Sequence, residues 1–198
     1  MAERPREIDD PVTGQRWVFL RTGADTDGEL LESELHVSAG GYVPSHFHPT
    51  QQETFTGVSG EFVVEIGGER RTIRPHDTVV IPPRTPHGFG PAREASQLLV
   101  TVRPALRLDD YFRVFLGLSR DRTIMAPARG IPRPLLQVAI VMDRFAPEVA
   151  AGGMPLALQR VVFRALAALG RWRGYRSSFE EYGVPSVGAA TAAASGAP

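Results

Sequence analysis

The chain contains no cysteine and no lysine. The absence of cysteine excludes disulfide bonds and thiolate metal ligands. All 22 basic residues are therefore arginines, and 22 acidic residues balance them to a net charge of zero. A neutral chain lacks the basic excess of nucleic-acid-binding domains, so we expect no nucleic-acid partner.

Long hydrophobic runs are also missing. No uninterrupted apolar stretch approaches the roughly 20 residues that a helix needs to cross a bilayer. Residues 1–7 are mostly charged and lack the apolar core of a secretory signal. We therefore expect a cytoplasmic protein and do not expect it to contact a membrane.

The first 104 residues show no helical periodicity. Short stretches of alternating apolar and polar residues are separated by turns rich in glycine and proline, a pattern typical of β-sandwiches and barrels. Gly67-Gly68 is a two-residue hairpin signal between two such stretches. Besides a strand that carries histidines, the predicted strands are residues 16–20, 29–38, 53–58, 61–66, 70–73, 78–81, 87–90 and 97–103.

Helical patterns begin only after Pro104. Each has apolar side chains spaced to share one helical face. The predicted helices are residues 108–118, 135–145 and 155–173. The predicted organisation is a barrel with an N-terminal arm over 1–104, a helical extension packed on it over 105–182, and a disordered tail of small residues over 183–198.

The last predicted helix combines a wide apolar stripe with arginines and no acidic residue. Arg160 and Arg164 lie beside the stripe, which consists of Leu158, Val161, Val162, Ala165, Leu166 and Leu169. Such a helix contacts a membrane or an acidic substrate, or it covers a core with its arginines in solvent. We favour the covering role, which is the usual one for an amphipathic helix in a globular protein.

The most informative stretch contains two histidines one residue apart. Side chains at i and i+2 of a strand point to the same face, so His46 and His48 can direct two imidazoles to one point while Phe47 points away. Glu53 enters the next predicted strand and can add a carboxylate oxygen. His87 opens a further strand after a proline-rich turn. Three neutral imidazoles and one carboxylate suit iron, manganese, nickel, copper or zinc.

The spacing of these residues resembles the first motif of the cupin superfamily. That motif is glycine, five residues, His-x-His, three or four residues, glutamate, six residues and glycine. Gly40, His46, His48, Glu53 and Gly60 match it with every gap in register.

The second cupin motif is matched in part. It is glycine, five residues, Pro-x-Gly, two residues, histidine, three residues and asparagine. Pro82 and His87 match, whereas His76, Arg84 and Pro91 stand at the two glycine positions and the asparagine position. The proposed metal ligand is therefore retained, while the residues of the turn depart from the family pattern.

The resemblance implies a mainly β fold, a cupin-type double-stranded β-helix, or jelly-roll barrel, with two or three C-terminal α-helices. It also implies one divalent metal ion per subunit, with iron favoured, and a homodimer. The expected function is a metal-dependent enzyme for a hydrophobic small molecule, aromatic compounds included, and most simply a non-haem iron dioxygenase. A metal-dependent isomerase, cyclase or lyase and a non-catalytic binding module are the alternatives.

The expected site has metal ligands and a pocket. His46, His48, Glu53 and His87 are the predicted ligands, and Glu53 is also the predicted catalytic base if it leaves the metal. The predicted pocket residues are Trp17, Phe55, Phe62 and Phe89. His36 and His76 are expected to be structural or surface residues.

Overall fold

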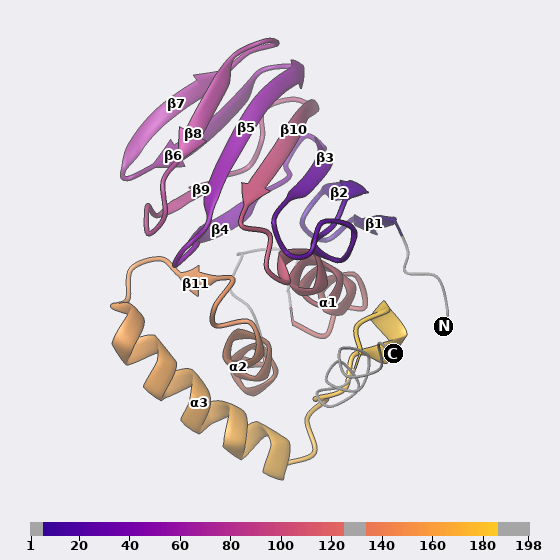
Figure 1. Cartoon of the computed structure of the whole chain (residues 1–198), viewed down its shortest axis with the longest axis vertical. Coiled ribbons are helices and arrows are strands. Elements are labelled where there is room, and N and C mark those ends of the chain that lie inside the picture. The colour runs from indigo at the N-terminus through magenta and orange to yellow at the C-terminus, as the bar shows by residue number, and fades with distance from the viewer. Residues whose placement is uncertain (1–5, 125–133, 186–198) are drawn as a thin grey trace, which may run out of the picture.

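A computed structural model of the chain describes residues 6–124 and 134–185. Within these residues, ten strands precede three α-helices, with one short strand between the last two helices. Figure 1 shows the helices together at one end of the sheets. The strands are β1 (Glu7–Asp10), β2 (Gln15–Arg21), β3 (Leu31–Val37), β4 (Val43–Phe47), β5 (Gln52–Ser59), β6 (Phe62–Ile66), β7 (Glu69–Ile73), β8 (Thr78–Ile81), β9 (His87–Phe89), β10 (Ser96–Arg103) and β11 (Ala150–Ala151). The helices are α1 (Leu108–Arg120), α2 (Leu135–Arg144) and α3 (Leu156–Trp172).

The strands form two antiparallel sheets. One has the order β1-β2-β3-β10-β5-β8 and the other the order β11-β4-β9-β6-β7. The chain passes back and forth between the sheets, from β3 to β4 to β5 to β6, as in a jelly roll. The prediction of a mainly β fold of this type with C-terminal helices is confirmed.

Alternation of side chains explains why the sheets face each other. In β3, Leu31, Leu35 and Val37 are buried on one face, while the glutamates between them are partly exposed. The same alternation in β5 buries Glu53 and Phe55. Because successive strand residues point to opposite faces, these buried side chains fill the space between the sheets.

The N-terminal segment differs from the predicted arm. Residues 7–10 form β1, which pairs antiparallel with β2 of the same chain through Glu7–Val18 and Asp10–Gln15. The alternating pattern of this strand, with Ile8 and Asp10 buried, is short and was hidden by its three acidic residues. This part of the predicted arm is therefore the edge of the larger sheet.

The helices share one core with the sheets. Phe112 of α1 stacks on Trp17 of β2, with ring centroids 4.3 Å apart. Beyond α3 the chain returns to the core, because Val184 is buried and bridges Phe179. The predicted tail thus includes at least one packed residue, and its part from residue 186 onward lies outside the described residues.

The exposed side of α3 corrects one expectation. Its packed face is formed by residues such as Gln159, Ala167 and Gly170, which are buried. Leu158, Val161 and Leu169, which we expected to cover the core, are exposed instead. Among the described residues, no helix has the length and apolar content that crossing a membrane requires.

Candidate metal centre

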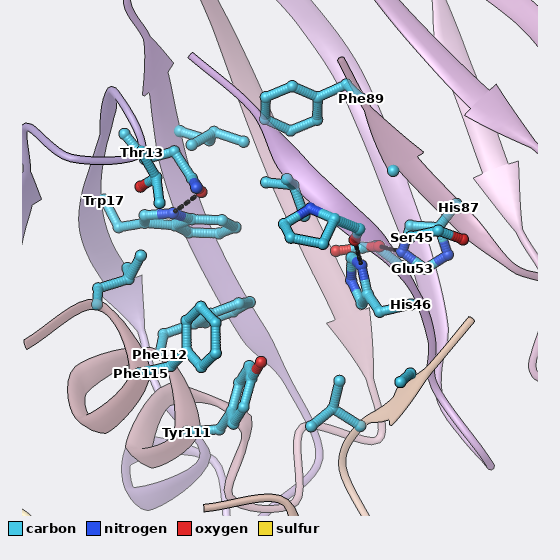
Figure 2. Close-up of a pocket in the computed structure, with 18 of the residues that line it drawn as sticks. Thr13, Trp17, Ser45, His46, Glu53, His87, Phe89, Tyr111, Phe112 and Phe115 are labelled. Carbon is cyan, nitrogen blue, oxygen red and sulfur yellow. Dashed lines mark hydrogen bonds and ion pairs between the residues drawn. The ribbon is translucent and has the colours of Figure 1, made fainter. Parts of the chain in front are cut away.

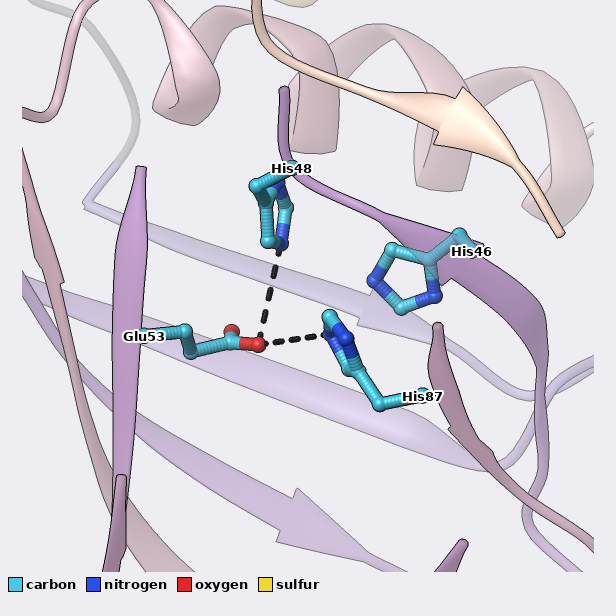
Figure 3. Close-up of side chains that lie close together, drawn as sticks. All are labelled: His46, His48, Glu53 and His87. Atoms are coloured by element: carbon cyan, nitrogen blue, oxygen red, sulfur yellow. Dashed lines mark ion pairs between the residues drawn. The ribbon is translucent and has the colours of Figure 1, made fainter. Parts of the chain in front are cut away.

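The four predicted ligands lie on three elements that meet inside the barrel (Figure 3). His46 lies on β4, and its partner in the antiparallel register is His87 of β9. Glu53 lies on β5 of the opposite sheet, and His48 directly follows β4. Strand pairing therefore places two of the imidazoles side by side, and the facing sheet supplies the carboxylate.

The side chains are close enough to share one cation. One potential ligand atom from each of the four residues lies within 4.8 Å of all the others. Glu53 Oε2 is 2.8 Å from His87 Nε2 and 3.6 Å from His48 Nε2. His48, Glu53 and His87 are buried, whereas His46 is only partly buried and lines the adjoining cavity.

Each imidazole is held by its other nitrogen. The Nδ1 atom of every ring faces a main-chain carbonyl oxygen, which can only accept a hydrogen bond. This assigns the ring proton to Nδ1 and leaves the lone pair on Nε2 free to bind a metal, a common arrangement around metal-binding histidines. The pairs are His46–Pro44 at 3.0 Å, His48–Glu148 at 2.7 Å and His87–Thr85 at 2.9 Å.

The imidazole nitrogens and the carboxylate oxygen that face one another at the centre of the cluster lack hydrogen-bond partners. Among the described residues, His48 Nε2, His87 Nε2 and Glu53 Oε2 are buried and make no hydrogen bond. His87 Nε2 and Glu53 Oε2 are close enough for an ion pair when His87 is protonated, but they form no hydrogen bond. Buried polar groups without partners are unfavourable, so several converging on one point fit a bound cation. The residues present therefore fit a divalent metal ion.

Electrostatics favours the metal-binding forms of His46 and Glu53. Burial lowers the pKa of His46 well below its ordinary value, and the neighbouring His87 and His48 rings lower it further. Burial alone would raise the pKa of Glu53, but the adjacent His48 and His87 rings outweigh it and lower that pKa. A neutral imidazole and an ionised carboxylate are the ligand forms required for metal binding. At His87, burial alone would lower the pKa, but the adjacent Glu53 carboxylate outweighs it and raises that pKa.

The C-terminal region takes part in the site. The carbonyl that orients His48 belongs to Glu148, 100 residues away along the chain. Directly after it, β11 pairs with β4 through Ala150–Phe47 and Ala151–His46. Residues 146–155 gave no strand pattern in the sequence, so this contribution was not predicted. The helical extension thereby supports two ligands of the cupin-like site.

Two turns that precede His87 contain other residues where the second cupin motif has glycine. His76 and Arg84, which stand at the two glycine positions of the second motif, have φ values of 75° and 64°. Glycine adopts this left-handed region readily, whereas other residues do so at a strain of about 1–2 kcal/mol. Both residues therefore adopt the left-handed backbone conformation that glycine favours.

A cavity of about 150 Å³ adjoins the metal ligands (Figure 2). His46, Glu53 and His87 form one wall, and the opposite walls come from the three helices. The wall residues are predominantly apolar. Its aromatic residues are Trp17, Phe55, Phe89, Tyr111, Phe112, Phe115 and Phe163.

Most polar groups in this wall are already engaged. Thr13 donates a hydrogen bond to Asp10 at 2.6 Å, and the Gln15 side-chain carbonyl accepts one from Trp17 at 3.1 Å. Ser45 and Tyr111 add hydroxyl groups, and Figure 2 shows the Tyr111 hydroxyl directed toward the space between α1 and the histidines. The cavity therefore suits an apolar molecule with few polar groups.

The predicted pocket residues separate into two groups. Trp17, Phe55 and Phe89 line the cavity. Phe62 does not, because it is buried behind them, 4.7 Å from Phe89 and 6.1 Å from Phe55 between ring centroids. Phe62 therefore supports the cavity wall from behind. The alternation of the sequence alone does not distinguish a residue that lines the cavity from one that lies behind its wall.

The helical part of the wall was missed. Tyr111, Phe112 and Phe115 lie on α1, and Val138 and Phe163 lie on α2 and α3. The signal available was the cluster of three aromatic residues in the first two turns after the last barrel strand. The other two histidines lie elsewhere, His36 beside Glu34 on the sheet exterior and His76 in an exposed turn.

Several solved structures are similar to part of this chain. Three similar solved structures are KdgF from a Halomonas species, an RmlC-like cupin from Shewanella frigidimarina and the DMSP lyase DddQ from Ruegeria pomeroyi. Their sequence identities are 24%, 23% and 28%, with TM-scores of 0.43, 0.45 and 0.36. The matches cover 48%, 53% and 38% of this chain and 84%, 88% and 39% of the respective structures.

No protein of curated function matches the chain. Residues 33–102 match a family model described as the cupin domain, a segment that runs from β3 to β10 and contains all four ligands. The first motif is complete over this segment, and the two sheets have the jelly-roll order. This segment of the chain, residues 33–102, is therefore a cupin domain.

Proposed function

We propose that this cupin is a metal-dependent enzyme for a small hydrophobic molecule, and that its reaction is an iron-dependent oxygenation. The observation that carries the proposal is the orientation of the three histidines. Each Nδ1 is tied to a carbonyl, and the Nε2 atoms face the buried carboxylate of Glu53. When bound, iron(II) would supply open positions for substrate and dioxygen and would activate dioxygen, which is the oxidant, by electron donation.

The size of the cavity limits the substrate. An apolar cavity of about 150 Å³ holds a molecule the size of benzene. The aromatic side chains around it favour a flat ring through edge-to-face and stacking contacts. We therefore infer a single-ring or similarly compact substrate, with a polar group that reaches toward His46 and the open side of the metal centre.

The scarcity of proton-transferring groups favours oxygenation over the alternatives. The titratable residues in the wall are His46, Glu53, His87 and Tyr111. The first three are the proposed ligands, and the lowered pKa of Glu53 makes it a weak general base. In this setting the chain contributes binding, orientation and exclusion of water, while the reactivity comes from the metal and dioxygen.

Tyr111 favours a second candidate, an isomerase or lyase that uses the metal to polarise its substrate. The Tyr111 hydroxyl faces the cavity, and burial raises its pKa, so it stays protonated near neutral pH. A protonated hydroxyl can donate a proton or a hydrogen bond to a developing anion. This role needs no dioxygen.

Oxygen uptake distinguishes the two candidates. Protein loaded with iron(II) is expected to consume oxygen in the presence of one member of a panel of phenols, catechols and aromatic acids. Tyr111→Phe is expected to retain this activity within about tenfold, whereas loss of a proton donor would lower a lyase or isomerase rate by about 10²–10⁴-fold. His48→Ala, which removes a proposed metal ligand, should abolish oxygen uptake, and His36→Ala, on the barrel exterior, is its matched control.

The outcomes have separate meanings. Turnover under strictly anaerobic conditions contradicts the oxygenase and supports the second candidate. Saturable binding of metal and ligand with no product in either atmosphere supports a non-catalytic binding cupin. Absence of metal binding contradicts all three.

A further inference from the structure

Helix α3 presents an apolar surface that no described part of the chain covers. Exposed apolar residues recur at intervals of three and four along it, which places them on one face. We call this face the α3 stripe. It consists of Leu158, Val161, Ala165, Ala168, Leu169 and Trp172.

The exposure of the α3 stripe is large. Val161 is 68% exposed and Trp172 is 79% exposed. The opposite side of the helix packs on α2, where a side chain at Gly170 would meet Ile140 and the carbonyl of Leu136. Leu135, the first residue of α2, is also exposed. Contiguous exposed apolar residues of this kind mark contact surfaces.

Arginines border the stripe on one side. Arg160, Arg164 and Arg171 follow one another at intervals of four and seven residues, so they form a row between the stripe and the packed face. Arg171 pairs with Asp143 of α2 at 3.2 Å. Helix α3 itself has no acidic residue. A partner surface for this helix is thus apolar and negatively charged.

A second copy of the helix does not provide that surface. In an antiparallel pair about a twofold axis, each border of the stripe meets the same border of the other copy. The row of Arg160 and Arg164 would then face an identical row, and the like charges of the two rows would repel each other. A bilayer with anionic headgroups meets both requirements, because acyl chains accept the apolar residues and headgroups attract the arginines.

We propose that α3 docks this protein on the surface of an anionic lipid bilayer, with the helix lying in the plane of the interface. Leu158, Val161 and Trp172 enter the acyl boundary, and Trp172 occupies the interfacial level where tryptophan is enriched. Figure 1 shows α3 at the periphery of the molecule, beside α2. The inner side of the same helix contributes Phe163 to the cavity wall, so docking brings the cavity close to a source of apolar molecules.

Vesicle binding by the full chain tests the proposal. The probes are vesicles of phosphatidylcholine and phosphatidylglycerol in equal amounts, compared with pure phosphatidylcholine, by co-sedimentation and tryptophan emission. We expect binding to the anionic vesicles, with a shift of emission to shorter wavelength. Trp172→Phe should remove the shift, because the remaining Trp17 is already buried.

Variants locate the contact. Val161→Glu is expected to lower binding at least about tenfold, because its side chain no longer enters the apolar phase. Replacing Arg160 and Arg164 by glutamine should lower it about fivefold for each charge. Val80→Glu is the matched control, since Val80 is an exposed valine on β8, away from α3, and its replacement should leave binding unchanged.

Three results would overturn the proposal. The first is a full chain that does not bind anionic vesicles. The second is a dimer in solution that Val161→Glu dissociates, because the stripe is then covered by a second copy. The third is a chain ending at residue 185 that binds vesicles when the full chain does not, because the stripe is then covered by the chain's own C-terminal segment.

Discussion

Replacement of His48 by alanine is expected to lower divalent-metal affinity by more than about 100-fold, beyond the 10–100-fold effect typical of residues that only support a ligand. The substitution removes one of four ligand atoms and releases the Glu148 carbonyl from its hydrogen bond. The barrel should persist, because the surrounding strands retain their pairing. Elemental analysis of protein purified without added metal, followed by competition with a chelator, measures the change.

The remaining histidines supply the controls. His46→Ala and His87→Ala are expected to lower metal occupancy in the same way, since both rings belong to the cluster. His36→Ala and His76→Ala should leave occupancy unchanged, because these residues lie on the exterior and in an exposed turn. Equal losses from all five substitutions would reflect general unfolding and would leave the ligand assignment unsupported.

Replacement of Val138 by phenylalanine is expected to abolish ligand binding while leaving metal occupancy intact. Val138 lies on α2 and lines the cavity without belonging to the metal cluster. A ring at this position fills space that a single-ring ligand needs, and one methylene in an apolar pocket already changes selectivity by about 10–200-fold. Calorimetric titration with phenol as a single-ring probe, together with metal analysis, measures both quantities.

The opposite substitution at the same position is the matched control. Val138→Ala enlarges the cavity and should shift binding toward larger rings without removing it. The melting temperature of Val138→Phe should stay close to that of the unmodified protein, because the new ring enters existing space rather than a filled core. Unchanged phenol binding in Val138→Phe would contradict the assignment of this cavity as the substrate site.

The strands and the ligand set were accessible from the sequence because both depend on local periodicity. A repeat of two residues specifies which side chains share a face, and it brought His46 and His48 together. His87 was placed by the chain order of a jelly roll, and the register of β4 with β9 confirms its position next to His46. The helices begin and end within two residues of their predicted bounds.

Features that depend on tertiary contacts were not accessible. The orientation of His48 by Glu148 joins residues 100 positions apart and uses a main-chain carbonyl, which no sequence pattern marks. The aromatic wall from α1 depends on how that helix packs against Trp17. Phe62 was misplaced because neighbouring inward-facing residues share one alternation, although some reach the cavity and others remain behind it.

The α3 stripe shows a second limit of prediction from sequence. Amphipathic periodicity indicates that a helix has an apolar face but not what that face contacts. In α3 the small residues Ala167 and Gly170 pack inward, while Val161 and Trp172 point to the exterior. An estimate based on hydrophobicity alone assigns the larger residues to the core, which is the reverse of the arrangement found here.

The central claim is that two imidazoles from one sheet, a third that directly follows it and a carboxylate from the other sheet share a single cation. An anomalous difference map from crystals of the iron-loaded protein, recorded at the iron edge, tests it most directly. We predict one peak inside the barrel at about 2.0–2.2 Å from the Nε2 atoms of the three histidines and an oxygen of Glu53, by analogy with other divalent metal sites. A map with no peak there, or with the rings turned away from one another, would contradict the account.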